Sequence, residues 1–596
     1  MKFLFLIILA GFLSCRNAED SQIHLEKQSW QMRVDTDSIG MRESWFAETF
    51  DRSHWESTRV GSSAKRANDA PNGFVWFATT FNVIEPKNAH SIYFGGIDGI
   101  SDIWLNGANI GTQGSNGEPF VLGTSGLVKS GNNLLVLRVR AFGSAQGISK
   151  SVVVCDSAGV EVLLRTKYST MVSRRSEEWV KNAIIYEVYL RSFSPEGTFK
   201  GLEHRIHELK RLGVTIVCLM PIHPIGEMNR KGTLGNPYSV QDYSGINPEF
   251  GTEADFRTLV KTVHAQGLKI IIELVANHTS WDSKLMFEHS NWFTHDDSGA
   301  IVAPAPDWND VADLNFDHHE LRKYMIEMMK HWVRDYDVDG FRCEVAELVP
   351  IDFWEVARKE IEKIKPVLML SDGALPEHHL EAFDITYSWN LHDLLLAVFA
   401  GGASSDSFNE LLKNEYYLYP TNALRLRFST IHRKNSWDAP AFRKVGPDES
   451  KLSAVLAFTL PGIPLIYNGE EVGNEKSLDL FKKVSIDWSK GEDFRELYSN
   501  LTRLRVLHPL FVDGAIEFLK TGTRRVVAFV RSRGNNQVLV VANCSNASQR
   551  VELDCSSFGV SSAKEYFSST KVEIKDKKLT MNLGAYGYAA FLPLSE

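Results

Sequence analysis

The chain has 596 residues and a formal net charge of −9, with 43% hydrophobic and 23% charged residues. A chain of this length and composition can bury several separate cores, at roughly 100–200 residues per domain. The mildly acidic balance provides no basic face, which excludes the electrostatic signature of a nucleic-acid-binding protein.

The N-terminus has the pattern of an export signal. Lys2 precedes an apolar run over residues 3–13, which ends at Ser14-Cys15. The run is too short for a spanning helix of about 20 residues, and its charged start and small final residue are typical of a secretory signal. Residues 1–15 resemble a bacterial lipoprotein signal in which Cys15 is lipidated; a plain signal peptide is the alternative. We therefore expect an exported bacterial lipoprotein in the periplasm, at the outer membrane or on the cell surface.

Residues 23–168 are predicted to form an all-β domain, because short alternating runs are separated by Gly, Asn, Asp and Pro. The runs lie at 74–83, 91–94 and 134–139. Residues 50–55, 103–107 and 131–134 resemble the sugar-binding jelly-roll domain that precedes the barrel in family 2 glycoside hydrolases. The resemblance implies a β-sandwich that either binds carbohydrate or serves as a spacer.

From about residue 179, short apolar runs alternate with stretches whose apolar residues recur at helical spacing. The predicted strands are 184–189, 214–219, 270–275, 338–345, 367–370, 424–428 and 464–467. The clearest predicted helices are 202–212, 253–266 and 320–336. This alternation favours a parallel α/β fold, and a (β/α)8 barrel of about 250 residues with insertions fits the length. A doubly wound sheet remains the alternative on composition alone.

Polar side chains gather at the ends of the predicted strands, where a barrel carries its function. Asn277-His278, Ser371-Asp372 and His432-Arg433 are three such groups. Arg342 and Glu344 are two residues apart on one predicted strand, so their side chains share a face. An internal structural ion pair is the alternative to a functional site.

Residues 179–488 resemble the α-amylase family, glycoside hydrolase family 13. The matching motifs, in order, are 185–188, 191–193, 212–221, 238–243, 247–252, 339–342 and 461–469. The resemblance implies a barrel over residues 172–510 with a short insert at 279–315. It also implies retaining hydrolysis or transglycosylation of α-linked glucans or oligosaccharides.

The resemblance places the catalytic carboxylate pair at two exchanged residues. Glu344 stands where the family has an Asp nucleophile, and Asp372 where it has a Glu general acid. Retaining glycosidases hold the two carboxyl groups about 5–5.5 Å apart. A longer nucleophile side chain and a shorter acid side chain can keep that separation while the pair as a whole is displaced. A misplacement of about 1 Å costs on the order of 100-fold in rate. Arg433 replaces a stabilising Asp and brings a cation near a cationic transition state.

Other family positions predict binding residues. Those that match sugar-binding positions are Tyr238, Asp242, His278, Arg342 and His432. Asn277 lies where many relatives bind structural calcium, a cation that prefers six to eight oxygen ligands. We expect no required cofactor, with calcium as the candidate metal.

Three functions follow from these residues. The first is a hydrolase or transglycosylase of α-glucans with an atypical carboxylate pair. The second is a catalytically inactive carbohydrate-binding lipoprotein, which burial of the carboxylates against Arg433 would favour. The third is a glycosidase of changed specificity, for a charged or modified sugar. The expected function is the first, because carboxylates remain at both positions that need them.

Residues 511–596 again show β-type runs, at 526–530, 538–541 and 588–592. They resemble the C-terminal β-sandwich of the family, and we expect a stabilising cap without chemistry of its own.

Overall fold

The structure is a computed structural model, which describes residues 22–61, 74–86, 89, 91–116, 119–124, 126–140, 147–305, 307–401, 403–437 and 440–594. The predicted export signal and Cys15 lie outside these residues. Over the described ranges, no helix is long and apolar enough to cross a membrane. The chain folds as two compact units: the N-terminal region with Leu396–Leu418, and Met171–Leu395 with Tyr419–Glu596.

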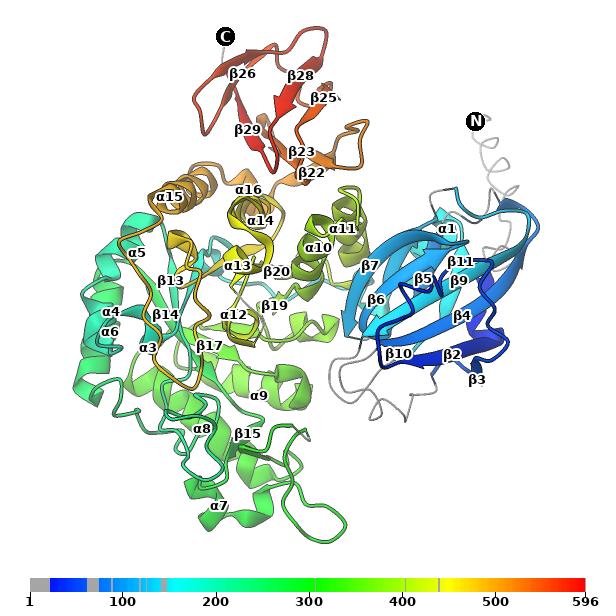
Figure 1. The fold of residues 1–596 in the computed structure, drawn as a ribbon. Coiled ribbons are helices and arrows are strands. Elements are labelled where there is room, and N and C mark those ends of the chain that lie inside the picture. Colours follow the sequence, from blue (N-terminus) through cyan, green and yellow to red (C-terminus); the bar gives the residue numbers. More distant parts are fainter. Residues whose placement is uncertain are drawn as a thin grey trace, which may run out of the picture. The chain divides into compact units, whose positions relative to one another are not determined.

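The first unit is built on antiparallel sheets (Figure 1). One sheet runs β1 (Ile23–His24), β11 (Val152–Cys155), β5 (Ser91–Phe94) and β8 (Phe120–Gly123). The other runs β10 (Gly147–Ile148), β6 (Ile97–Leu105), β9 (Gly131–Arg140), β4 (Phe74–Val83), β2 (Trp30–Asp35) and β3 (Glu56–Thr58), with β7 (Ala108–Asn116) on β6. A shared core includes Ile92 and Val152 from one sheet and Phe77 and Leu137 from the other, so the strands pack as a sandwich.

Helix α11 (Ser407–Leu418) belongs to this first unit, which differs from the predicted continuous barrel domain over 172–510. It packs against α1 (Ser157–Leu164) and β8. Tyr417 packs on a small apolar cluster that includes Leu164, and Thr166 donates to the Leu418 carbonyl at 2.9 Å. The apolar face of α11 therefore buries itself outside the barrel.

In the described part of the second unit, eight parallel strands close a barrel. Their order is β12 (Ile185–Val188), β13 (Ile216–Leu219), β14 (Lys269–Leu274), β17 (Gly340–Cys343), β18 (Leu368–Ser371), β19 (Ile385–Tyr387), β20 (Leu424–Arg427) and β21 (Ile463–Tyr467). The closed barrel confirms the predicted fold and excludes the doubly wound sheet. Strand β19 was missing from the predicted set, because three residues are too few to show a period.

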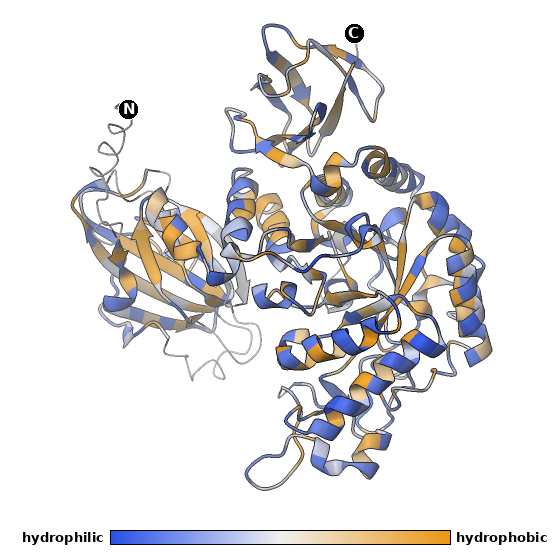
Figure 2. Cartoon of the chain, turned by 180° about the vertical axis from the view of Figure 1, so that it is seen from behind, coloured by the Kyte–Doolittle hydropathy of each residue, from blue (hydrophilic) through white to orange (hydrophobic). Residues whose placement is uncertain are grey.

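Helices surround these strands, and Figure 2 shows their mixed hydrophobic and hydrophilic faces beside the mainly hydrophobic strands. They are α2 (Glu178–Lys181), α3 (Leu190–Phe193), α4 (Phe199–Glu203), α5 (Ile206–Leu212), α6 (Glu253–Ala265), α8 (His319–Asp335), α9 (Ile351–Glu362), α10 (Trp389–Phe399), α12 (His432–Trp437), α13 (Ala441–Val445), α14 (Pro447–Thr459), α15 (Glu492–Leu507) and α16 (Leu510–Asp513). The predicted helix 202–212 is divided between α4 and α5.

Local sequence explains how the strands that carry the site are positioned. Gly340 has φ 147°, and a Cβ there would lie 2.0 Å from the Leu368 carbonyl oxygen, so only glycine lets β17 approach β18 this closely. Thr252 and Asp255 form a capping box that starts α6 before β14.

The insert after β14 holds β15 (His278–Ser280), α7 (Lys284–Glu288) and β16 (Val311–Asp313). The C-terminal region forms one sheet of β22 (Ala515–Phe518), β23 (Val526–Arg533), β24 (Asn536–Asn543), β29 (Tyr588–Pro593), β26 (Ser562–Glu565) and β27 (Lys571–Glu573). A second sheet pairs β25 (Gln549–Asp554) with β28 (Lys578–Leu583).

Candidate active site

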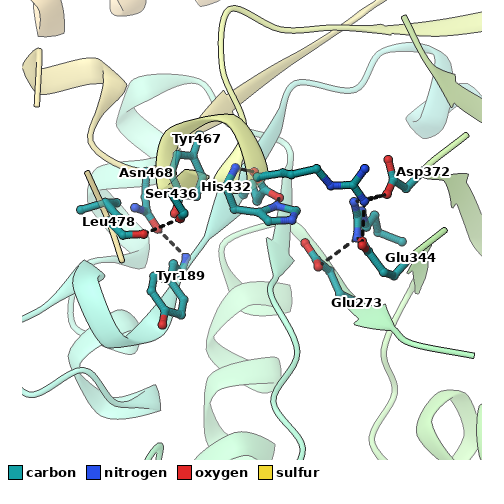
Figure 3. A network of polar contacts seen from close by, with 12 residues as sticks. Tyr189, Glu273, Glu344, Asp372, His432, Ser436, Tyr467, Asn468 and Leu478 are labelled. Carbon is teal, nitrogen blue, oxygen red and sulfur yellow. Dashed lines mark hydrogen bonds and ion pairs between the residues drawn. The ribbon is translucent and has the colours of Figure 1, made fainter. Parts of the chain in front are cut away.

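Glu344 and Asp372 follow the neighbouring strands β17 and β18 and meet around one guanidinium (Figure 3). Arg433 Nη2 lies 2.8 Å from Glu344 Oε1 and 2.7 Å from Asp372 Oδ2. The two carboxylate oxygens are therefore no further apart than these two hydrogen bonds laid end to end, which does not exceed the about 5–5.5 Å between the carboxyl groups of retaining glycosidases. The space between them is filled by the guanidinium.

A second arginine lies on the barrel side of the same pair. Arg342 Nη1 pairs with Glu344 and lies 3.2 Å from Glu273 Oε2, while its Nη2 lies 3.0 Å from Asp372 Oδ2. Burial alone would raise the pKa of Glu344, but Arg342 and then Arg433 outweigh burial and hold that pKa well below its usual range. Glu344 is therefore an anion that is ion-paired with both Arg342 and Arg433.

The chain turns sharply after Glu344. Val345 adopts the left-handed region with φ 40° and ψ 44°, which is rare for a β-branched residue. Such backbone outliers cost on the order of 1–3 kcal/mol and cluster at functional sites. The strained residue directly follows Glu344 and therefore borders the arginine–carboxylate cluster.

The floor of the site is a chain of hydrogen bonds. The Tyr238 hydroxyl lies 2.6 Å from Glu273 Oε2 and 2.7 Å from His432 Nε2, and His432 Nδ1 lies 2.5 Å from Glu187 Oε1. Burial raises the pKa of Glu273 to about 8 and that of Glu187 to about 7, and it lowers the pKa of His432 to about 4. The imidazole is therefore neutral at pH 7, and Glu273 holds a proton.

Arg433 is more exposed to solvent than the other charged residues of the site. The Arg433 side chain is 37% exposed, whereas Arg342 is fully buried and the Asp372 side chain is 1% exposed. The Arg433 guanidinium lies 5.6 Å from the ring centre of the half-exposed Trp389. Arg433 thus separates the carboxylate pair from solvent.

The structure brings most of the predicted site residues together. His278 is buried, and the charge of Glu344 acts on its pKa, although burial dominates and lowers that pKa to about 4. His432 and Arg433 are the first two residues of α12, which follows β20. Asp242 pairs with Lys284 and accepts from the Ser244 N–H, contacts that lie outside the arginine–carboxylate cluster.

Asn277, the predicted calcium ligand, has other partners. Its Nδ2 donates to Asp313 Oδ1 at 3.4 Å, and its Oδ1 lies 3.1 Å from His278 Nδ1. These contacts bring in one carboxylate, whereas calcium prefers six to eight oxygens. They do not fit a calcium site.

Sequence reasoning missed Glu187, Tyr387 and Trp389. Glu187 is fully buried in β12, and Tyr387 Oη accepts from Arg342 Nε at 3.1 Å. Trp389 stacks on Tyr387 with ring centres 5.3 Å apart. A charged residue inside the apolar run of β12 was a usable signal for Glu187, because a buried carboxylate needs a partner. Tyr387 ends β19, the strand that was too short to predict, and Trp389 follows that strand.

A parallel barrel with paired carboxylates at the C-terminal ends of its strands has the arrangement that a glycoside hydrolase uses. The Alpha amylase, catalytic domain family matches residues 156–299 and 281–373, and the Maltogenic Amylase, C-terminal domain matches 516–589. The chain belongs to the alpha-amylase family of glycoside hydrolases.

Individual relatives agree with this assignment. A noncanonic maltogenic alpha-amylase from Thermotoga neapolitana is 32% identical, with a TM-score of 0.64 over 70% of this chain and all of that one. An alpha-amylase from Lactobacillus plantarum is 31% identical, with a TM-score of 0.63 and the same coverage. A cyclomaltodextrinase from Geobacillus thermopakistaniensis is 23% identical over 70% of this chain and 78% of its own length.

Proposed function

We propose that this chain binds α-linked gluco-oligosaccharides at the C-terminal mouth of the barrel and does not cleave them while Arg433 holds the carboxylate pair. The named activities of the relatives support an α-glucan ligand. The observation that carries the lack of turnover is the single nitrogen, Arg433 Nη2, within hydrogen-bond distance of both Glu344 and Asp372.

The guanidinium lies where a retaining glycosidase needs its reaction centre. The transition state of glycoside hydrolysis is cationic and lies between the two carboxyl groups. Arg433 already supplies a cation between Glu344 and Asp372, so it satisfies the charge that the transition state would bring. Asp372 Oδ2 also faces Arg342, so two guanidinium groups surround the atom that would protonate a leaving group.

Aromatic side chains beside the closed pair provide surfaces for sugar rings. Trp308 is half-buried and meets the His278 ring at 5.5 Å between centres, and Trp389 is half-buried under Arg433. Aromatic rings offer large apolar faces that can cover the apolar faces of a pyranose. In this proposal the glucan lies on these rings, and the Glu344–Asp372 gap stays filled.

The second candidate is retaining hydrolysis with Glu344 as nucleophile and Asp372 as general acid. The specific observation in its favour is that both carboxylates remain and contact the same nitrogen, Arg433 Nη2. This activity requires Arg433 to leave the gap before the sugar enters. An anionic or modified sugar that recruits Arg433 is a third candidate. Lipid anchoring through Cys15 remains a prediction from sequence.

Calorimetry and product analysis separate these functions. Maltotetraose is titrated into the wild type, and reducing-sugar release from maltooligosaccharides, pullulan and starch is followed in parallel. We expect binding without release. Release that Glu344→Gln or Asp372→Asn abolishes would establish the second candidate, and neither binding nor release would point to a different, anionic sugar.

The binding surface needs its own control. Trp308→Ala removes a ring that the proposal uses, and Trp281→Ala removes a half-buried tryptophan of the same insert whose indole N–H donates to the Asn309 carbonyl at 2.9 Å. We expect the Trp308 exchange to weaken maltotetraose binding by more than the Trp281 exchange. Equal effects would refute the proposed placement of the sugar.

A further inference from the structure

We propose that Glu187 and Glu273 share one buried proton, and that loss of this proton at alkaline pH strengthens the hold of the carboxylate pair on Arg433. A carboxylate oxygen of Glu187, one of Glu273 and a ring nitrogen of His432 all lie within 4.8 Å of one another. The two glutamate side chains are at most 1% exposed. Two carboxylates this close repel each other when both are ionised, and one proton between them removes the repulsion. The proposal does not depend on sugar binding.

The hydrogen bonds around the two carboxyl groups show where this proton lies. His432 Nδ1 lies 2.5 Å from Glu187 Oε1, and the backbone N–H of His432 donates to Glu187 Oε2 at 3.3 Å. Arg342 Nη1 donates to Glu273 Oε2 at 3.2 Å. Among the described residues, Glu273 Oε1 accepts from none. A hydrogen bond with Glu273 lowers the pKa of Glu187, as a donor does to a carboxylate, so the proton lies on Glu273 and is donated to Glu187.

This placement leaves the surrounding polar atoms paired. Because Glu187 is the anion of the pair, the neutral His432 ring keeps its proton on Nδ1, and its Nε2 is an acceptor. The Tyr238 hydroxyl, 2.7 Å from Nε2, donates to it. Glu273 Oε2 has Arg342 as its donor. Buried polar atoms are seldom left unsatisfied, and the shared proton meets that requirement here.

The two carboxyl groups titrate as one unit. Burial raises the pKa of Glu273 to about 8 and that of Glu187 to about 7, and because the groups interact, these values belong to the pair. The shared proton therefore leaves as pH rises through about 8. Other titratable groups act on the pair from the strands and loops around it. They are Cys218, Tyr238, Arg342, Glu344, Asp372, Tyr387, His432, Tyr467 and Glu470.

Arg342 connects the shared proton to the carboxylate pair that holds Arg433. Its Nη1 pairs with Glu273 and Glu344, and its Nη2 pairs with Asp372. When the proton leaves, the new charge at Glu273 competes for Arg342, which then neutralises Glu344 and Asp372 less. These two carboxylates therefore attract Arg433 more strongly. Linkage makes the effect reciprocal, so without Arg433 the glutamate pair holds its proton more tightly.

Infrared spectroscopy of the full chain at pH 7 tests whether the proton is shared. Glu187→Gln, Glu273→Gln and the double variant are compared with the wild type, with circular dichroism as the folding check. We expect each single variant to lose the C=O absorbance of one protonated carboxyl group, and the double variant to lose no more than that. Loss in fewer than both single variants, or twice the loss in the double variant, would show that the two groups share no proton and would overturn the proposal.

Neutron diffraction of wild-type crystals keeps the test valid if a variant fails to fold. We expect one deuteron between the carboxyl oxygens of Glu187 and Glu273. A map without a deuteron there would overturn the proposal.

The effect on Arg433 is tested by urea unfolding of Arg433→Ala and the wild type from pH 7 to pH 9. We expect the ratio of their unfolding constants to grow about tenfold over this range, the equivalent of a pKa shift of one unit. The growth should disappear when both proteins also carry Glu273→Gln. It should persist with Glu471→Gln, the same exchange at a buried carboxyl that accepts from Tyr186. A ratio independent of pH, or growth that survives Glu273→Gln, would overturn the proposed link to Arg433.

Discussion

Arg433→Ala is the perturbation that bears most directly on the closed carboxylate pair. It removes the guanidinium from Glu344 Oε1 and Asp372 Oδ2, while Arg342 still contacts Glu344 Oε2 and Asp372 Oδ2. The gap then admits one more sugar ring, whose hydroxyl groups can donate to the freed oxygens. A hydrogen bond to a charged group contributes about 1.5–3 kcal/mol, so one new bond corresponds to roughly 10–100-fold tighter binding.

The same change should cost stability, but less than the loss of a fully buried partner. Removing one member of a buried ion pair costs about 3–5 kcal/mol. Arg433 is 37% exposed and Arg342 still neutralises the pair, so solvent and the remaining arginine offset part of this cost. We expect a loss of about 1–3 kcal/mol.

Calorimetry with maltotetraose is the assay, and Lys434→Ala is the control. Lys434 is the next cation on α12 and pairs with Asp393 at 3.8 Å rather than with the carboxylate pair. The control should bind maltotetraose as the wild type does. Weaker binding by Arg433→Ala would refute the reasoning, because it would show that the guanidinium holds the sugar instead of excluding it.

Three further predictions concern the scaffold around the site. Burial raises the pKa of Glu273 from its ordinary 4.5 to about 8, so the folded chain binds more protons between these values and its stability falls as pH rises from 5 to 8. Glu273→Gln should flatten this fall in urea unfolding, and an unchanged slope would contradict the assignment. Gly340→Ala should lower the free energy of unfolding by more than about 1 kcal/mol through its backbone conformation alone. The overlap of the new Cβ with Leu368 adds to this loss. A normal soluble yield and an unchanged urea unfolding midpoint would disprove the prediction. Asp384→Ala breaks a buried ion pair with Arg358 and should lower the free energy of unfolding by about 3–5 kcal/mol. Asp352→Ala removes a carboxylate that is 65% exposed and should lower it by about 0–1 kcal/mol. Equal losses in urea unfolding would contradict the role of burial.

The barrel strands were the elements that could best be predicted from the sequence. A run such as 270–275 is apolar at every position except Glu273 because a parallel barrel strand is buried on both faces, and β14 lies there. Strand β19 escaped prediction because Ile385–Tyr387 is too short for a pattern, and so Tyr387 and Trp389 were not placed near the site. Helix α11 has an ordinary amphipathic sequence, which does not reveal that it packs on the first unit.

The family positions of Glu344, Asp372 and Arg433 could be read from motifs, but their contacts could not. The three residues follow β17, β18 and β20, and which oxygen meets which nitrogen depends on strand order and on the turn at Val345. Asp242 is a further example, because the motif match does not reveal that the fold pairs it with Lys284. Contacts between strands are set by tertiary geometry, which spacing along the chain does not encode.

A crystal structure of the wild type after prolonged soaking with maltotetraose tests the central claim most directly. The account predicts an intact tetrasaccharide on the aromatic rings at the barrel mouth, with Arg433 still bridging Glu344 and Asp372. Shortened sugar, or a glucosyl group bonded to Glu344 with Arg433 displaced, would contradict it.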